Sequence, residues 1–264
     1  MKAIALGFHD VIEGSLPDAS GFPGPTAARY KIDGTEFDAQ MSALAACRVS
    51  VVADVKTLGS EGAALPVLLT FDDGGSGALA AADRIERRGW RGHFFVTAGR
   101  IGTAAFLDKA GVRALHERGH VVGTHSWSHP ERMSSLGDGE QMNEWRKSTA
   151  YLSDILGAPV DVASVPGGYY DQGVARAAAR AGLRVLFTSE PTARLALVDG
   201  CLVAGRFAVM RGTSPRAVAA IAAGRIGPRV LQSIAWNAKK AAKSAGGEYY
   251  LRLRKLLIGR GGRP

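Results

Sequence analysis

Two adjacent carboxylates, Asp72 and Asp73, follow the apolar run Pro66–Phe71 and precede two glycines. A continuous apolar run of this length is typical of a buried parallel strand, and glycines allow a turn directly after it. Neighbouring residues on a strand point to opposite sides, but a turn can bring both carboxylates into one pocket. The pair is therefore a candidate for metal binding or proton transfer. The alternative is an ordinary turn in which an aspartate caps the next helix.

Two histidines, His125 and His129, follow a second predicted strand, His120–Thr124. A spacing of four residues lets two imidazoles reach one point if the segment makes a helical turn, and imidazole is a common metal ligand. The alternative is one exposed and one packed histidine. By itself, this histidine pair is a weaker signal than the two carboxylates.

The elements that must position these residues alternate between short apolar runs and amphipathic segments. The predicted strands cover residues 4–8, 66–71, 93–97, 120–124, 160–165, 184–188 and 202–209, and the predicted helices cover residues 36–46, 78–88, 112–118, 140–156 and 172–181. Such alternation predicts an α/β fold with parallel strands joined by crossover helices, as an open sheet or a barrel. No glycine-rich phosphate-binding motif opens any of the helices.

In either architecture, functional residues gather at the carboxyl ends of the strands. Asp72, Asp73, His125 and His129 all follow strands, so we expect them at the same edge of the sheet. One carboxylate and two imidazoles with an open position for water form a typical catalytic metal site. A second carboxylate then remains free.

The segment TFDDG, with His125 placed 52 residues after Asp73 in HSWSHP, resembles the polysaccharide deacetylase (NodB-homology) family of carbohydrate esterases. The resemblance covers about residues 1–210. It implies a distorted (β/α) barrel that hydrolyses N-acetyl groups of amino sugars with a divalent metal. It also implies that Asp73, His125 and His129 bind the metal, with Zn²⁺ preferred and Co²⁺, Ni²⁺ or Mn²⁺ as alternatives, and that Asp72 is the general base.

A third motif of that family, Arg-x-Pro-Tyr, is altered in this chain. Ser164 stands in place of the arginine and Gly167 in place of the tyrosine. The resemblance implies that the Gly167 backbone N–H helps to hold the oxyanion, because that donor belongs to the main chain. Ser164 is not expected to orient the base as the family arginine does, and Arg206 is a candidate substitute by its position alone. Otherwise Pro166–Gly168 is simply a turn.

The family's carboxyl-terminal catalytic histidine is missing, since no histidine follows His129. His9, after the first strand, resembles the histidine of a Tyr-His-x-Val opening found in some members, and strand one should neighbour the last strands. We therefore take His9 as the candidate general acid, with a capping or core histidine as the alternative. His93 and His120 begin strands and should lie at the opposite, stabilising end of a barrel.

The net charge of +9 is confined to one end of the chain. Residues 1–224 carry equal numbers of acidic and basic side chains, whereas residues 225–264 carry ten basic residues and the single acid Glu248. This distribution argues against a nucleic-acid groove in the body. We predict a catalytic domain over 1–224 and a basic amphipathic helical extension over 225–264. The extension either packs on the barrel or lies on an anionic membrane surface.

Cysteine use and the lack of a secretion signal indicate a reduced compartment. Cys47 and Cys201 fit no disulfide or metal spacing, the first residues do not form a signal peptide, and no apolar run could span a bilayer. We therefore expect a cytoplasmic protein, with peripheral attachment to the inner face of the membrane as the alternative. A cytoplasmic enzyme would meet a nucleotide sugar or a lipid-linked saccharide rather than a finished polymer.

The sequence as a whole predicts a metal-dependent carbohydrate N-deacetylase acting on linear amide C–N bonds. Its substrate would be an amino sugar in a polysaccharide or lipid-linked saccharide of envelope or exopolysaccharide biosynthesis. Two alternatives remain, an inactive carbohydrate-binding relative and a deformylase or other amide hydrolase on the same fold. The sequence leaves the oligomeric state open.

Overall fold

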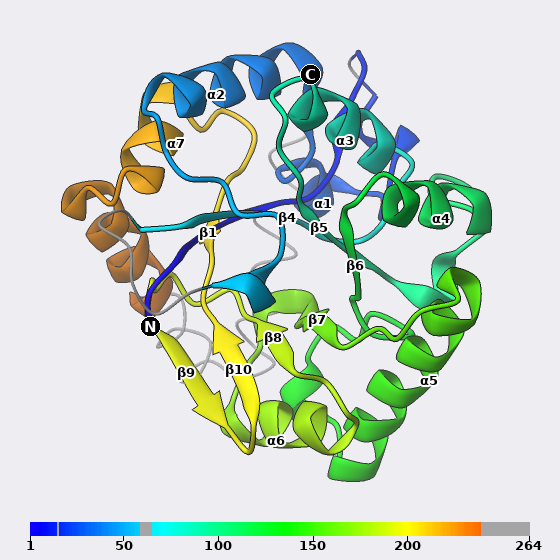
Figure 1. Cartoon of the computed structure of the whole chain (residues 1–264). Helices are drawn as coiled ribbons and strands as arrows, with labels where there is room; N and C mark the ends of the chain where they lie inside the picture. The colour runs from blue at the N-terminus through cyan, green and yellow to red at the C-terminus, as the bar shows by residue number, and fades with distance from the viewer. Residues whose placement is uncertain (15, 59–64, 239–264) are drawn as a thin grey trace.

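A curled nine-stranded sheet forms the centre of the computed structural model, which describes residues 1–14, 16–58 and 65–238 (Figure 1). Eight strands run parallel and only the last one in the order is antiparallel. The order is β11 (Phe207–Ala208), β1 (Ile4–Phe8), β4 (Val67–Phe71), β5 (His93–Val96), β6 (Val121–Thr124), β7 (Val162–Ser164), β8 (Val185–Phe187), β10 (Cys201–Ala204) and β9 (Leu195–Val198).

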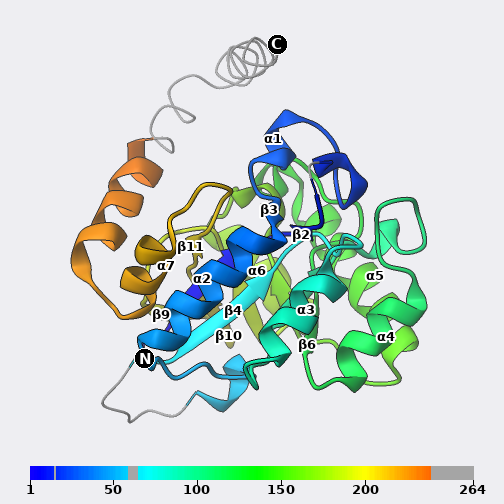
Figure 2. The same cartoon turned by 90° about the horizontal axis from the view of Figure 1, so that it is seen from above.

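Helices surround the sheet, as the crossover connections require (Figures 1 and 2). They are α2 (Gly34–Ala46), α3 (Ala78–Glu86), α4 (Lys109–Glu117), α5 (Asp138–Leu156), α6 (Gln172–Arg180) and α7 (Pro215–Ala222). A smaller unit between β1 and α2 contains β2 (Val11–Ile12), α1 (Pro25–Ala28) and β3 (Ile32–Asp33). Short 3₁₀ turns lie at Pro17–Ala19, Val55–Thr57, Ala98–Arg100, Met133–Ser135 and Pro166–Gly168.

The two ends of the sheet meet at a seam. Lys2 and Arg194 form an antiparallel bridge, Ala3 N–H donates to the carbonyl of Ala193, and Leu195 N–H donates to the carbonyl of Met1. β1 also lies beside β11, so the first and last strands are neighbours, as expected. The predicted distorted (β/α) barrel is thereby confirmed.

Burial explains why the strands read as continuous apolar runs. All five residues of β1 and all five residues of β4 are buried, because helices cover the outside and side chains fill the inside. Phe71 stacks on Phe8 on one side and on Phe94 on the other, with ring centroids 5.4 and 4.6 Å apart. These rings hold β1, β4 and β5 in fixed positions, which in turn fixes the residues at their carboxyl ends.

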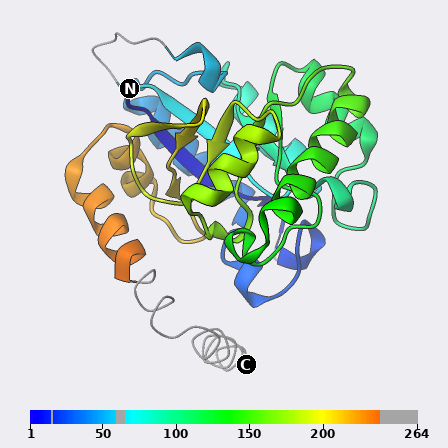
Figure 3. The ribbon, with the colours of Figure 1, turned by 90° about the horizontal axis from the view of Figure 1, so that it is seen from below.

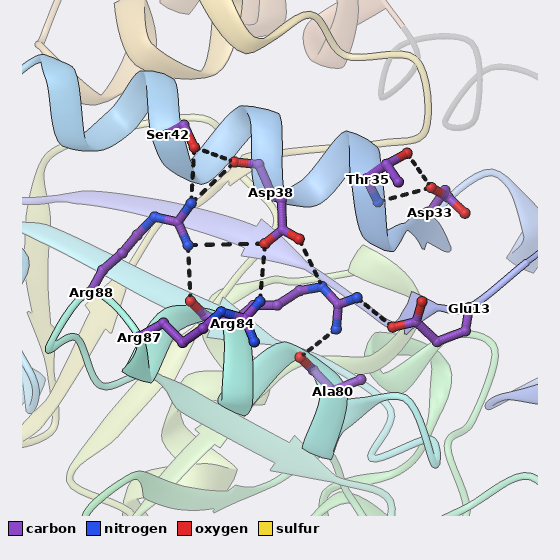
Figure 4. Close-up of polar contacts among 9 residues, drawn as sticks. All are labelled: Glu13, Asp33, Thr35, Asp38, Ser42, Ala80, Arg84, Arg87 and Arg88. Carbon is purple, nitrogen blue, oxygen red and sulfur yellow. Dashed lines mark hydrogen bonds and ion pairs between the residues drawn. The ribbon is translucent and has the colours of Figure 1, made fainter.

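Arginines in and just after α3 bind polar side chains of α2 (Figure 4). Arg84 pairs with Glu13 and, through Nε, with Asp38 at 3.4 Å; Arg88 donates to Ser42 Oγ at 2.9 Å. Asp33 caps α2 by accepting the Thr35 N–H. The helices that follow β3 and β4 are therefore tied together beside the loop that carries Glu13.

The structure departs from the predicted elements in the last third of the sheet. The strand predicted over 202–209 is broken into β10 and β11 at Gly205 and Arg206. A Cβ at Gly205 would lie 2.3 Å from the Glu190 carbonyl oxygen, so the backbone passes too close for any other residue. The break lets Arg206 leave the ladder and turn inward. The antiparallel strand β9 and the helix α7 were not predicted.

Residues 226–238 form a further helix that packs on the body of the molecule (Figure 3). Gln232 Nε2 donates to the Ala208 carbonyl, and Ser233 Oγ donates to the Pro191 carbonyl, both at 2.9 Å. The rest of the predicted basic extension, 239–264, lies outside the described residues. Among the helices of the described segments, none combines the length and the apolar character that a membrane span requires.

Candidate active site

Asp73, His125 and His129 converge at the carboxyl edge of the sheet. One ligand atom from each lies within 4.8 Å of the other two. Nε2 of His125 and Nε2 of His129 are each 3.6 Å from Asp73 Oδ1. Tetrahedral ligands at about 2.0–2.1 Å from a zinc ion would be about 3.4 Å apart, so the spacing fits a small divalent ion. The three predicted ligands therefore form a group suited to a metal.

An unusual backbone conformation turns Asp73 into this group. Asp73 has φ of 77°, in the left-handed region that non-glycine residues rarely adopt, and Gly74 follows with φ of 75°. Its carbonyl accepts the Thr97 N–H, while the Asp72 N–H continues the ladder to Phe8. The chain thus turns within one residue after β4, and both carboxylates face the same buried space, as the sequence predicted.

The segment from His125 to His129 is a bend rather than the helical turn that would also let residues at this spacing converge. Ser126 and His129 both have positive φ, at 68° and 59°. Side chains hold the bend: Glu144 accepts the backbone N–H of Trp127 and Ser128, and Ser126 Oγ accepts the His129 N–H. A half-buried glutamate on α5 holds this bend in place of helical hydrogen bonds, so the two imidazoles meet by tertiary contacts.

Ser164, at the end of β7, bridges the metal group and the neighbouring carboxylate. Its Oγ donates to Asp72 Oδ1 at 2.9 Å and lies 2.5 Å from His125 Nδ1. The Ser164 carbonyl oxygen, which can only accept, is 3.0 Å from the same Nδ1. Nδ1 therefore carries the proton, and Nε2 keeps the lone pair that a metal needs. The expectation that Ser164 plays no part in orienting the base is wrong.

Arg206 binds Asp72 through two parallel hydrogen bonds. Nη1 donates to Oδ1 at 2.7 Å and Nη2 donates to Oδ2 at 2.8 Å. The side chains are 4% and 5% exposed, so the pair is buried. Two-pronged pairing of this kind fixes the carboxylate plane. Arg206 thus occupies the position toward Asp72 that the sequence assigned to it as a substitute for the missing arginine.

Burial and charge separate the two aspartates. Burial alone would raise the pKa of Asp72, but the Arg206 guanidinium, with His125, outweighs it and holds that pKa far below the usual range. Burial raises the pKa of Asp73 to about 6, and the charge of Asp72 adds to this shift. Burial lowers the pKa of His125 to about 3. Asp72 is therefore ionised, and His125 is a neutral ligand, at neutral pH.

Gly167 lies three residues after Ser164, in the turn Pro166–Gly168, with φ of 67°. A Cβ there would lie 2.4 Å from the Glu131 carbonyl oxygen, so the tyrosine of the family motif cannot fit in this backbone. Within the described part of the chain, the Gly167 N–H has no hydrogen-bond acceptor. This N–H remains available at the carboxyl end of β7.

His9 directly follows β1 beside Asp72, because Phe8 pairs with Phe71 in the sheet. It is half-buried, its ring packs on Tyr30 with centroids 4.5 Å apart, and its charge lowers the pKa of Asp73. The structure therefore brings His9 to the same edge as the metal group. It is neither a core histidine nor a helix cap.

The segment between β2 and β3 contributes residues that the sequence analysis missed. Phe22 packs on the ring of His129, with centroids 4.4 Å apart, and is half-buried. Lys31, itself buried, holds this segment by donating to the carbonyls of Pro17 and Phe22 at 2.7 and 2.6 Å. In the sequence, the contact of Phe22 with His129 is marked only weakly, by an aromatic residue among prolines and glycines.

Asp10 is a second buried acid near the metal group that the sequence analysis did not single out. Burial, together with the neighbouring charge of Asp73, raises its pKa to about 7. A Cβ at Gly75 would lie 2.2 Å from Asp10 Oδ2, so a glycine is required next to it. Asp10 thus lies directly behind the turn that carries Asp73.

Fold and site together define a curled (β/α) barrel whose strand ends carry a two-histidine, one-carboxylate group beside an arginine-bound aspartate. Residues 60–186 match the polysaccharide deacetylase family model. This match and the fold confirm the resemblance to the polysaccharide deacetylase family that the sequence motifs predicted.

Known relatives agree with this assignment. Over 93 residues the chain is 31% identical to a peptidoglycan-N-acetylglucosamine deacetylase, PgdA, of Listeria monocytogenes; the match covers 34% of this chain and only 19% of that relative. The fold matches a polysaccharide deacetylase from Bacillus cereus with a TM-score of 0.69 at 16% identity, covering 84% of this chain and 69% of the other. IcaB from Ammonifex degensii matches with a TM-score of 0.67 at 22% identity, covering 84% and 97%.

Proposed function

We propose that this protein is a metal-dependent hydrolase that removes N-acetyl groups from an amino sugar of a cell-envelope polysaccharide or lipid-linked saccharide. The observation that carries the proposal is the convergence of Asp73, His125 and His129 next to the Asp72–Arg206 pair. The names of the Listeria relative and of the Bacillus cereus structure, both deacetylases of saccharides, support a saccharide substrate.

Asp73 Oδ1 and the Nε2 atoms of His125 and His129 would hold the ion. Two imidazoles and one carboxylate suit Zn²⁺, with Co²⁺, Ni²⁺ or Mn²⁺ as alternatives. A divalent ion in such a site polarises a carbonyl oxygen and lowers the pKa of water to about 7. Ser164 sets the His125 tautomer, so the protein presents a lone pair to the ion without rearrangement.

Asp72 would act as the general base. It is ionised at neutral pH, and Arg206 holds it in one plane. Oδ1 accepts from both Arg206 and Ser164, whereas Oδ2 accepts only from Arg206 among the described residues. Oδ2 therefore retains the lone pair that can take a proton from the attacking water. Arg206 supplies the guanidinium contact to Asp72 that the altered third motif lacks.

The Gly167 N–H would stabilise the negative oxygen that forms on the amide carbon, and His9 would return a proton to the leaving sugar nitrogen. Both groups follow strands at the same edge as Asp72. The half-buried faces of Phe22 and Tyr30 pack on His129 and His9 and border the place where a sugar ring would bind. Aromatic rings suit the apolar faces of sugar rings.

The test is acetate release from N-acetylglucosamine oligomers by the purified full chain loaded with Zn²⁺ or Co²⁺. We expect turnover by the wild type, loss in Asp72→Asn, and no change in Asp154→Asn, which alters an exposed aspartate on α5. Asp72→Asn that retains full activity would overturn the mechanism. Formate release from N-formyl sugars without acetate release would indicate the deformylase alternative. Sugar binding without bound metal or turnover would indicate a non-catalytic relative.

A further inference from the structure

A cavity of about 330 Å³ lies at the seam of the barrel, between the body and the helix 226–238. Three basic residues line it, Lys2, Arg194 and Arg229, and no acidic residue does. The remaining lining residues are apolar or uncharged: Leu65, Pro191, Thr192, Ala193, Phe207, Ile226, Val230 and Ser233. The cavity therefore combines concentrated positive charge with an apolar wall.

Two of these cations stand at directly paired positions of neighbouring backbone segments. Lys2 and Arg194 are partners in the antiparallel bridge that joins the sheet ends. Like charges at directly opposite positions repel, since their Cβ atoms are about 4.5–5.5 Å apart. Neither residue forms an ion pair with a carboxylate within residues 1–14, 16–58 and 65–238. An anion between them would relieve this repulsion.

The third cation, Arg229, is held in place with its charge unpaired among the described residues. Its guanidinium lies over Phe207, 5.3 Å from the ring centroid, and Nη1 donates to the Gly224 carbonyl at 3.2 Å. Its Nε is buried and has no hydrogen-bond partner in the described part of the chain. The arginine is thus pre-positioned and retains donors for an anionic ligand such as phosphate.

Exposed apolar side chains surround this cavity. Of the large hydrophobic residues exposed in the described segments, all except Leu16 belong to three neighbouring elements at the seam: the amino-terminal residue, β9 and the helix 226–238. They are Met1, Leu197, Ile226, Val230, Leu231 and Ile234, which are 45–75% exposed. Figure 1 shows the amino terminus, β9 and this helix along one side of the molecule. Clustered exposure of this kind marks an interaction surface.

We propose that this seam surface docks on an anionic lipid bilayer, with the phosphate of one lipid headgroup in the cavity between Lys2, Arg194 and Arg229. The exposed apolar residues of the helix 226–238 would enter the boundary between headgroups and acyl chains. A soluble anion explains the cations but not the apolar rim, and an apolar protein partner explains the rim but not the unpaired cations. An anionic lipid explains both.

The same helix connects the seam to the active site. Near the end of this helix, Trp236 lies against the turn Pro166–Gly168. A Cβ at Gly168 would be 3.3 Å from a ring carbon of Trp236. Gly168 adjoins Gly167, the proposed oxyanion donor. Docking through this helix would therefore hold the active-site loop near the membrane, where a lipid-linked saccharide would be found. This consequence rests on the proposed function, whereas the docking itself does not.

The test measures co-sedimentation of the full chain with phosphatidylcholine vesicles, with and without phosphatidylglycerol. We expect binding only with phosphatidylglycerol. The double variant Lys2→Gln, Arg194→Gln should bind about 25-fold more weakly, since each cation near an anionic surface contributes about a fivefold factor. Arg176→Gln with Arg216→Gln removes two exposed charges elsewhere and should bind like the wild type. Leu231→Ser with Ile234→Ser should also weaken binding, whereas Leu16→Ser should not.

Several results would overturn the proposal. Equal binding to both vesicle types, or wild-type binding by the Lys2, Arg194 variant, would remove the headgroup site. Loss of binding only in Lys239→Gln, Lys240→Gln, Lys243→Gln would assign the interaction to the chain beyond the described residues. Calorimetric binding of inorganic phosphate, with apolar variants that behave as wild type on vesicles, would indicate a free-phosphate site instead. None of these measurements needs turnover, so acetate release from a soluble substrate tests the proposed function separately.

Discussion

His93 begins β5 and His120 precedes β6 at the amino ends of the strands, whereas His125 and His129 follow β6 at its carboxyl end. At the amino ends, the acceptor nitrogens are occupied: His93 Nε2 accepts the Val55 N–H and His120 Nδ1 accepts the Gly92 N–H. At the carboxyl end, the Ser164 carbonyl accepts the His125 Nδ1–H, which leaves the Nε2 lone pair facing Asp73. His93 and His120 thus accept backbone N–H groups and have a structural role. His125 and His129 instead direct nitrogen atoms at Asp73.

Each end also combines a histidine with an acid and an arginine. At the amino ends, Glu86 contacts both Arg118 and His120, and these acidic and arginine side chains are 24% and 29% exposed. At the carboxyl end, Asp72 and Arg206 are almost fully buried. The comparison teaches that residue type alone does not make a site. An open nitrogen, a buried charge and a shared strand edge together distinguish the candidate site from the structural network.

The largest effect is expected when the same substitution is made at the carboxyl ends and at the amino ends of the strands. His125→Gln should lose the bound metal and reduce acetate release by on the order of a thousandfold, because the ion supplies several kcal/mol of transition-state stabilisation. His93→Gln should keep both metal and activity. Elemental analysis of the purified variants and acetate assays measure the two outcomes. Equal metal loss in both variants would show that the ends do not differ as described.

The two arginines provide the next test. Arg206→Met leaves Asp72 buried without its partner and should lower the free energy of unfolding by about 3–5 kcal/mol. Arg118→Met removes a partly exposed pair and should cost at most about 1 kcal/mol. Urea denaturation compares both variants with the wild type. The distinction between buried and exposed pairs fails if the two losses are equal.

The dependence of stability on pH sharpens the role of His93. Burial lowers its pKa to about 4 from an ordinary value of 6.5. The unfolded chain therefore binds the proton more readily, and stability falls as the pH drops through this window, by on the order of 3 kcal/mol in full. His93→Gln lacks this penalty. Its free energy of unfolding relative to the wild type should therefore rise as the pH falls from 7 to 4. A constant difference across that range would contradict the assignment.

The smallest expected effect concerns the phenylalanines that pack on histidines at the two ends. Phe22 lies 4.4 Å from His129, and Phe94 lies 4.9 Å from His120, between ring centroids. Phe22→Leu should raise the KM for an N-acetylated oligosaccharide about fivefold, with little change in stability, because an aromatic contact is worth about 1 kcal/mol. Phe94→Leu should lower stability and leave KM unchanged. The reverse pattern would assign Phe22 to the core.

Much of the fold could be predicted from local pattern. The seven predicted strands have counterparts in the sheet, because buried parallel strands require unbroken apolar runs. The single strand predicted over 202–209 was wrong, since the break at Gly205 depends on how closely Glu190 approaches the backbone. β9 also escaped prediction. None of its four residues is buried, since it lies at the outer edge of the sheet, so it lacks the burial that marks the other strands.

The site shows the same division. Asp72, Asp73, His125 and His129 are marked by their types and their positions after strands, both of which are local properties. The two histidines converge without the helical turn that their spacing would allow, because Glu144 of α5 holds the segment as a bend. That contact joins residues far apart in the chain, so no local pattern announces it.

The residue types of the candidate metal group, their place after apolar runs and the charge-neutral body are all evident from the amino-acid sequence. The tertiary structure alone decided that Arg206 reaches Asp72 across 134 positions, that Ser164 connects Asp72 to His125, and that Phe22 covers His129. The local residue pattern indicates which segments form strands, and the end of each buried apolar run indicates where the strand ends. Which side chains meet there depends on the strand order and on the backbone break at Gly205, which only the folded chain defines.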